Sequence, residues 1–248
     1  MKEVQAIMGT SVVVNIRDKE AKKEFFDEVF DYFRYVDEKF STYKQTSEIT
    51  KINNKEISES EMTEDMKTVF KLSQETKEIT NGYFDIIDRD GLFDPSGLVK
   101  GWSIFNAANI LKERGVKNFF VEAGGDIQVC GKNDKDEPWV VGIQSPFNTK
   151  KEIVKKVYVS DKGVATSGTY ILGQHIYNPN NKIERLEEIV SLTVIGPDIY
   201  EADRFATAAF AMGRLGVEFI EKLDGFEAYS IDKNGIATMT TGFNNYVK

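Results

Sequence analysis

The chain of 248 residues has only one cysteine and lacks long apolar segments, and both facts exclude certain classes of protein. Its single cysteine, Cys130, excludes an intramolecular disulfide, and its place in an apolar run is typical of a small buried residue. No run of about 18 apolar residues occurs, which excludes a transmembrane helix. The first ten residues, MKEVQAIMGT, lack an apolar signal-peptide core and a lipid-attachment cysteine. If Met1 is the native start, we therefore expect a cytoplasmic protein.

Positive charge is also in short supply. The 32 lysines and arginines are outnumbered by 40 acidic residues, which gives a net charge of −8. Without a basic stripe, neither nucleic acid nor an anionic lipid surface is an expected partner. Apolar residues make up 41% of the chain, enough for a real core. No repeat, low-complexity tract or interdomain linker interrupts it, so we expect one domain over residues 1–248.

Hydrophobic periodicity predicts helices and strands that alternate early and strands that follow one another later. Residues 19–40 carry apolar side chains at three- and four-residue steps and predict a helix whose aromatic stripe faces the core. Further helices are expected at 63–79, 101–114, 201–212 and 215–223. Strands are expected at 4–16 (bent at Gly9), 117–121, 127–130, 139–144, 153–159 and 190–195, with a closing hairpin of 226–231 and 236–240. This order predicts an α+β fold with a mixed, largely antiparallel sheet flanked by helices.

The segment 94–131 carries the densest chemical signal. Asp94 is followed by a turn of small residues, by Lys100-Gly101 at the expected start of a helix, and then by a strand that meets Gly124-Gly125-Asp126. A helix N-terminus beside a lysine and a glycine turn suits a phosphate or pyrophosphate. A purely structural loop–helix–strand unit explains the same residues equally well.

Two further features point to chemistry. Asp203 and Thr207 are four residues apart, so on a helix they share one face. A carboxylate and a hydroxyl suit Mg²⁺, although an Asp near a helix start also serves as a cap or dipole partner. His175 is the only histidine and thus the only imidazole that titrates near pH ~6.5. It is a candidate proton acceptor, or a partly buried hydrogen-bonding residue.

Six sequence blocks flank or follow this segment in a fixed order. They are MGT (8–10), FSTYKQTSEITKIN (40–53), NGYFDI (81–86), VATSGTY (164–170), QHIYNP (174–179) and EADRFATAAFAMG (201–213). Together with 94–131, this ordered set resembles the FAD:protein FMN transferases, the ApbE-type flavin transferases. The resemblance extends from Met8 to Gly213, which is most of the chain.

The resemblance implies a set of site residues. Asp203 and Thr207 match the acid and hydroxyl of the family's metal-binding helix, and the turn at Gly97 matches a backbone oxygen ligand. His175 matches the active-site histidine of an H-x-x-D-P block, which would deprotonate the acceptor hydroxyl or position the phosphoryl group. The residues expected to cradle the flavin dinucleotide are Met8, Tyr43, Tyr83, Phe84, Asp85, Asp94, Lys100 and Tyr177. For the aromatic residues, and above all for Phe84, core packing is the competing interpretation.

Two other blocks are less specific. Residues 166–168 form a hydroxyl-rich segment that we expect to be a turn near the site, able to hydrogen-bond phosphate. Gly124-Gly125-Asp126 either lets the backbone approach the nucleotide or makes a tight turn between strands.

The chain also departs from the family pattern. Asn178 replaces the acid that usually precedes the proline, and Asn180-Asn181-Lys182 replaces a Thr-Gly pair. Only eight residues separate Asp85 from Asp94, where the family usually carries a longer insertion, and Phe105 stands where an acid is frequent. The first departure bears on catalytic rate, and the short spacing predicts a pared-down substrate cleft.

The sequence hypothesis is therefore Mg²⁺-dependent transfer of the FMN moiety of FAD to a threonine or serine hydroxyl of an acceptor protein, with release of AMP. The implied partner is an acceptor flavoprotein with a threonine-containing motif. Two alternatives remain open: a hydrolase that converts FAD to FMN and AMP, and a flavin-binding protein without turnover.

Overall fold

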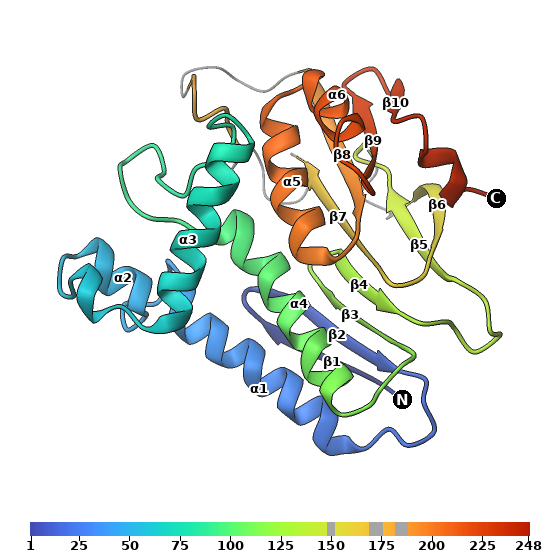
Figure 1. The fold of residues 1–248 in the computed structure, drawn as a ribbon, viewed down its shortest axis with the longest axis horizontal. Coiled ribbons are helices and arrows are strands. Elements are labelled where there is room, and N and C mark those ends of the chain that lie inside the picture. The colour runs from blue at the N-terminus through green and yellow to red at the C-terminus, as the bar shows by residue number, and fades with distance from the viewer. Residues whose placement is uncertain (148–151, 169–175, 182–187) are drawn as a thin grey trace.

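A computed structural model of the chain describes residues 1–147, 152–168, 176–181 and 188–248. Its centre is an eight-stranded sheet in the order β1-β2-β3-β4-β7-β8-β9-β10, and every pairing is antiparallel (Figure 1). The strands are β1 (Lys2–Ile7), β2 (Thr10–Ile16), β3 (Phe119–Ala123), β4 (Asp126–Cys130), β7 (Lys162–Gly168), β8 (Ile189–Gly196), β9 (Glu227–Asp232) and β10 (Ala237–Met239). The predicted α+β fold is thus confirmed.

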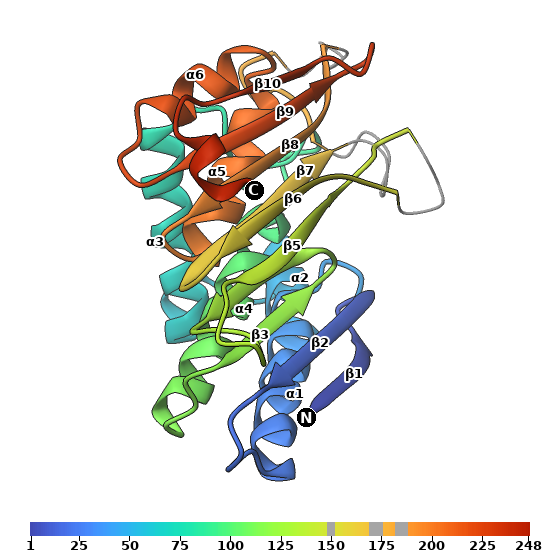
Figure 2. The ribbon, with the colours of Figure 1, turned by 90° about the vertical axis from the view of Figure 1, so that its right-hand side faces the viewer.

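Helices cover one face of this sheet, and a separate hairpin covers part of the other. The hairpin pairs β5 (Trp139–Gln144) with β6 (Ile153–Val159) and lies in front of the sheet in Figure 2. The helices are α1 (Lys23–Phe40), α2 (Glu48–Asn53), α3 (Glu64–Ile79), α4 (Ser96–Glu113), α5 (Ile199–Ala211) and α6 (Leu215–Glu221), with short 3₁₀ turns η1 (Glu59–Glu61) and η2 (Phe243–Tyr246).

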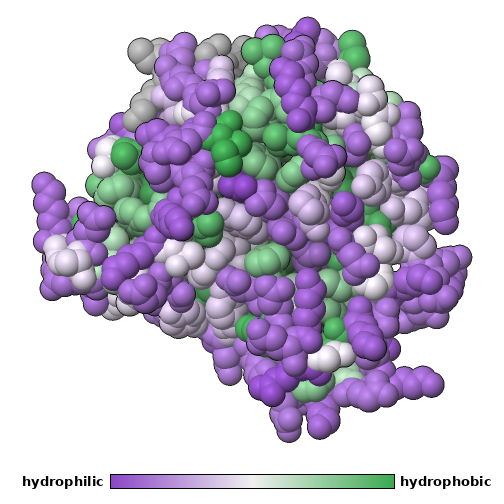
Figure 3. Space-filling view, viewed as in Figure 1, coloured by the Kyte–Doolittle hydropathy of each residue, from purple (hydrophilic) through white to green (hydrophobic). Residues whose placement is uncertain are grey.

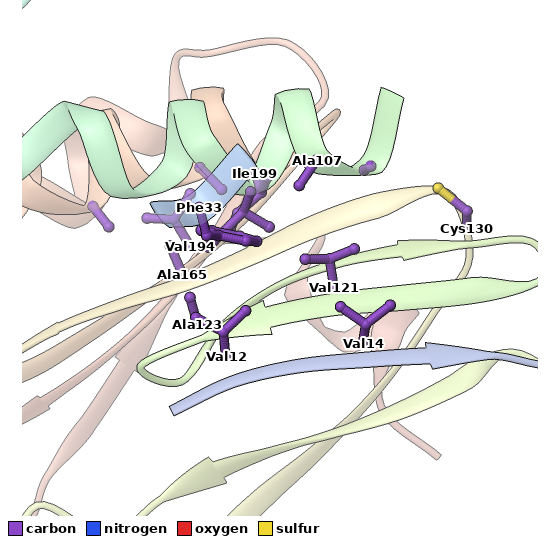
Figure 4. Packing of buried hydrophobic residues seen from close by; sticks show 14 of the residues in the cluster. Val12, Val14, Phe33, Ala107, Val121, Ala123, Cys130, Ala165, Val194 and Ile199 are labelled. Carbon is purple, nitrogen blue, oxygen red and sulfur yellow. The ribbon is translucent and has the colours of Figure 1, made fainter. Parts of the chain in front are cut away.

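The main core lies between the sheet and α1, α4 and α5. Val12, Val14 and Val121 project from alternate positions of β2 and β3 toward the helices, where Phe33 and Ile199 meet them (Figure 4). Alternation arises because successive strand side chains point to opposite faces. This core fixes α4 and α5 side by side on the sheet.

The aromatic stripe predicted along residues 19–40 is core, as expected. The helix begins at Lys23, later than predicted, and buries Phe26, Phe33 and Phe40 among others. Full burial of such a side chain stabilises the fold by about 1.5–3 kcal/mol. The side of the helices that faces away from the sheet carries mainly hydrophilic residues, with hydrophobic residues in scattered patches (Figure 3).

The expectation of one bent strand over residues 4–16 was wrong. Met8 and Gly9 both have positive φ, +56° and +68°, and they form a tight two-residue turn, so β1 and β2 are a hairpin. Left-handed backbone at both turn positions is what a two-residue hairpin requires. The polar stretch 41–60 contains α2, whose first turn is capped by Ser47 accepting the Thr50 amide.

Two other expectations near the site were also wrong. The helix expected at 101–114 begins at Ser96, so Lys100 and Gly101 lie one turn inside α4 instead of at its start. Residues 166–168 are not a turn but the end of β7, which pairs with β4 and β8.

In the part of the chain that the structure describes, no helix is long and apolar enough to cross a membrane.

Candidate active site between helices α4 and α5

Helices α4 and α5 approach each other closely at Gly101. A Cβ atom at this position would lie 2.5 Å from the Cβ of Asp203 and 2.8 Å from the carbonyl oxygen of Ile199. The absence of a side chain lets the Gly101 amide donate a 2.7 Å hydrogen bond to Oδ2 of Asp203. The glycine therefore positions the buried carboxylate against the first turns of α4.

Gly97 lies one turn before Gly101 on α4 and also contacts α5. Its carbonyl accepts a 3.4 Å contact from the Thr207 hydroxyl. A Cβ at Gly97 would lie 3.2 Å from Cγ2 of Thr207, so this residue also needs to be small. Two of the predicted ligand residues, Gly97 and Thr207, thus meet across the two helices, one turn from the contact between Gly101 and the third, Asp203.

Lys100 lies beside this oxygen cluster. Its Nζ is 2.5 Å from Oδ2 of Asp126 and 3.7 Å from Oδ1 of Asp203. Asp126 begins β4, and its Oδ1 accepts the Thr166 amide of β7 at 2.9 Å. The sequence hypothesis took Gly124-Gly125-Asp126 either as backbone that approaches the nucleotide or as a tight turn, and it gave this carboxylate no role of its own. The signal that could have identified it is an acid directly after two glycines at the edge of a strand.

Burial and neighbouring charges determine the protonation of this cluster. Burial raises the pKa of Asp203 to about 7, with Asp126 adding to the rise, while Lys100 and the Gly101 amide oppose it. For Lys100, burial lowers the pKa, but Asp126 and Asp203 outweigh it and hold the pKa above its ordinary value. The lysine is therefore a fixed positive charge next to two carboxylates.

The start of α5 is fixed to the sheet by several polar contacts. Asp198 caps the helix by accepting the Glu201 amide, and Oε1 of buried Gln128 accepts the Ile199 amide at 2.8 Å. A Cβ at Gly163 of β7 would lie 2.2 Å from the backbone of Asp198, so the strand and the helix start are in close contact. This anchoring holds Asp203, one turn further, in one position.

The NGYFDI loop lies next to the cluster. Phe84 is buried, and a Cβ at Gly97 would lie 3.3 Å from its ring, so this phenylalanine packs in the core beneath the site. Asp85 pairs with Lys77 at 2.7 Å. Asp94 accepts the Ser96 amide at 3.0 Å, just before α4. Tyr83 is half-buried in the same loop.

The segment after His175 packs on that loop. The Tyr177 hydroxyl donates to the Ile87 carbonyl at 3.3 Å, and the Arg89 guanidinium lies 4.4 Å from the centre of the Tyr177 ring. Nδ2 of the Asn180 side chain donates to the Asn81 carbonyl at 3.1 Å. The structure therefore brings together two sequence blocks that are about ninety residues apart. His175 itself lies outside the described residues.

Two predicted flavin contacts are not joined to the cluster by any described interaction. Tyr43 is 94% exposed in the turn between α1 and α2. Met8 lies in the β1–β2 turn. It packs against the sheet core and also against a second hydrophobic cluster, to which α1, α2, α3 and α4 contribute side chains. Their roles in binding remain predictions.

The described hollows of the surface lie elsewhere. One of ≈ 370 Å³ lies between α1 and α2 and includes Lys39 and Glu48; another of ≈ 480 Å³ lies beside Glu28 and Arg114. Neither includes a predicted site residue.

Over the described part of the chain, no three His, Cys, Asp or Glu side chains gather as a metal site, so the candidate ligands are the mixed oxygen set of Asp203, Thr207 and Gly97.

Comparison with known proteins shows the family of the chain. The model of the ApbE family matches residues 8–90 and 87–230, which include both helices and all the loops described above. The chain belongs to the ApbE family.

Curated relatives match over about half of the chain. The FAD:protein FMN transferase of Vibrio cholerae is 30% identical over 128 residues, 48% of this chain and 38% of its own. That of Escherichia coli K12 is 27% identical over 150 residues, 57% of this chain and 43% of its own. The matched segments thus span less than half the length of these relatives.

Solved ApbE structures share the fold over the whole chain. The flavin transferase ApbE from Vibrio cholerae superposes with a TM-score of 0.86 at 21% identity, covering 100% of this chain and 99% of its own. The ApbE protein from Thermotoga maritima gives 0.88 at 21% identity with the same coverage. At this identity the likeness establishes the fold.

Proposed function

We propose that this ApbE-family chain transfers the FMN moiety of FAD to a threonine or serine hydroxyl of an acceptor protein and releases AMP, in a Mg²⁺-dependent reaction. The observation that carries the proposal is the convergence of Asp203, Thr207 and Gly97 beside Lys100. The proposal is further supported by the curated relatives, which are named FAD:protein FMN transferases.

The residues present fit a hard divalent cation. A carboxylate, a hydroxyl and a carbonyl are all oxygen donors, which Mg²⁺ prefers, and three protein donors leave positions for phosphate oxygens. Thr207 Oγ1 and Gly97 O are 3.4 Å apart, and Asp203 lies one turn before Thr207 on α5. When bound there, Mg²⁺ would supply neutralising charge for the pyrophosphate of FAD.

Lys100 and the α4 turn would hold the rest of the pyrophosphate. The lysine has an electrostatically stabilised positive charge and a partly exposed side chain, so it can meet a phosphate oxygen without leaving the site. Positioning and charge stabilisation supply most of the rate enhancement in phosphoryl transfer.

The transfer itself exchanges one bond to phosphorus for another. The acceptor hydroxyl oxygen attacks the phosphorus of the FMN phosphate, the bond to the bridging oxygen breaks, and AMP leaves with that oxygen. The hydroxyl proton would be accepted by His175, the only imidazole of the chain.

The test is incubation with FAD and Mg²⁺, with and without an acceptor domain that carries a threonine flavinylation motif. A gain of one FMN group on the acceptor, with AMP formed only when the acceptor is present, is the expected result. AMP and free FMN without an acceptor would assign a hydrolase, and no AMP in either reaction would leave a flavin-binding protein.

A further inference from the structure

Asp126 is a buried carboxylate that the proposed reaction leaves without a role. It follows Gly124 and Gly125, whose φ angles of +62° and +97° turn the chain from β3 into β4. One of its oxygens lies 2.5 Å from the Lys100 ammonium, and the other accepts the Thr166 amide at 2.9 Å. Both oxygens are therefore held by partners on different elements.

Its surroundings make this carboxylate rigid. Thr166 belongs to β7, which pairs with β4, and its hydroxyl lies 2.8 Å from the hydroxyl of Thr193 on β8. Asp126 itself is only 1% exposed. A carboxylate fixed by three central strands is well placed to determine where a flexible lysine side chain lies.

Two carboxylates compete for that lysine. The Lys100 ammonium is 2.5 Å from Asp126 but 3.7 Å from Asp203, so the closer pair is with the residue that is not a candidate metal ligand. A lysine paired closely with Asp203 would neutralise the charge that a divalent cation needs. At 3.7 Å the lysine still attracts Asp203, but it lies beyond hydrogen-bond distance of Oδ1, so this oxygen is less strongly held and more open to a cation.

We propose that Asp126 is a positioning residue: it holds the Lys100 ammonium away from close pairing with Asp203, so that Asp203 remains available to a divalent cation. This inference rests on the proposed function for the identity of the metal-binding residue. It gives the acid after the two glycines a task in the site, whereas the glycines alone account only for the turn.

A double-mutant cycle on Asp126 and Lys100 tests the proposal. Mg²⁺ affinity is measured from the Mg²⁺-dependent rise in unfolding temperature, without FAD, for the wild type, Asp126→Asn, Lys100→Met and the double variant. Asn keeps an oxygen for the Thr166 amide. We expect Asp126→Asn to weaken Mg²⁺ binding by about 10-fold or more, and to have little effect once Lys100 is Met.

Two other outcomes of the cycle decide against the proposal. An equal loss in both backgrounds would mean that Asp126 acts on the cation directly and not through Lys100. No loss in either background would make it a structural residue. Should Asp126→Asn fail to fold, folding of the double variant would still support the link to Lys100, and failure of both would refute it.

A crystal structure of Asp126→Asn gives a readout that is independent of metal and of activity. The Lys100 ammonium is expected within about 3 Å of an Asp203 oxygen. A lysine that stays away from Asp203 would overturn the proposal even if Mg²⁺ affinity fell. Conversely, a wild type that binds no Mg²⁺ would refute the metal assignment in the proposed function, while the lysine position would still decide the role of Asp126.

Asp161→Asn is the matched control. Its carboxylate also accepts a backbone amide, that of Gly131 at 2.8 Å, but just beyond the other end of β4. Unchanged Mg²⁺ affinity in this variant is expected, and it would exclude a general effect of removing one negative charge.

Discussion

The amide of Gly101 donates a 2.7 Å hydrogen bond to the carboxylate of Asp203, across 102 positions of sequence. This contact helps to join the two helices that carry the candidate metal ligands. It exists because Gly101 has no side chain, which leaves room for the side chain of Asp203 against α4.

Gly101→Ala is expected to destabilise the protein. Alanine is the better helix former by about 1 kcal/mol, so a change in an unobstructed helix would stabilise it. Here the new Cβ would lie 2.5 Å from that of Asp203, and overpacking of this kind costs about 1–3 kcal/mol. Urea unfolding measures the difference, and a variant at least as stable as the wild type would show that the helices separate freely.

Asp203→Asn is expected to make the stability of the metal-free protein less sensitive to a rise in pH from acid to neutral. Burial raises the folded pKa of Asp203 to about 7, above its ordinary value of 3.8. The folded state therefore binds more protons than the unfolded state in this window, so wild-type stability should fall as pH rises from about 4 to 7. Asparagine has no such titration.

The measurement is urea unfolding in EDTA at pH 5 and pH 8 for both proteins. The stability of Asp203→Asn relative to the wild type should improve at pH 8. If the free energies of unfolding of the two proteins differ by the same amount at both pH values, the Asp203 carboxylate is not in a destabilising environment.

The hydroxyl of Thr207 is expected to matter for metal binding and its methyl group for packing. Thr207→Val keeps the shape beside Gly97 but removes the oxygen, and we expect at least about a tenfold loss in Mg²⁺ affinity, ~1.4 kcal/mol. Thr207→Ser keeps the oxygen and is the matched control. Calorimetric titration with Mg²⁺ compares them, and equal affinities for Val and Ser would remove Thr207 from the ligand set.

Tyr43→Ala separates flavin binding from folding. The side chain is 94% exposed, so its removal should change the free energy of unfolding by no more than about 0.5 kcal/mol. If the ring stacks on the flavin or the adenine, FAD binding should weaken by about 1–3 kcal/mol, while Tyr43→Phe should bind normally. Flavin fluorescence measures the affinity, and unchanged binding by Tyr43→Ala would assign the ring to another surface role.

The sequence predicted those parts of the fold that local patterns determine. The long amphipathic helices, the strands β5 and β6 and the closing β9–β10 hairpin were expected within about five residues of their observed bounds, because apolar periodicity and turn residues mark them. The strand β7 was missed since Gly163, Ser167 and Gly168 have little strand propensity. Its pairing with β4 and β8, which lie far away in sequence, determines its structure.

The candidate site was predictable where residues lie on one helix and not where they meet across the fold. Asp203 and Thr207 share a face of α5, as their spacing indicated. The pairing of Lys100 with Asp126 depends on how α4 lies on the sheet, which no local spacing encodes. The hydrogen bond from Gly101 depends on the same packing.

The most direct test of the account is a count of AMP released per FMN attached to an acceptor domain, for the wild type and for Asp203→Asn, with Mg²⁺ and with EDTA. The account predicts one AMP for each FMN group with wild type and Mg²⁺, and neither product with EDTA or with Asp203→Asn. Attachment of FMN that persists in EDTA, or in Asp203→Asn, would contradict it.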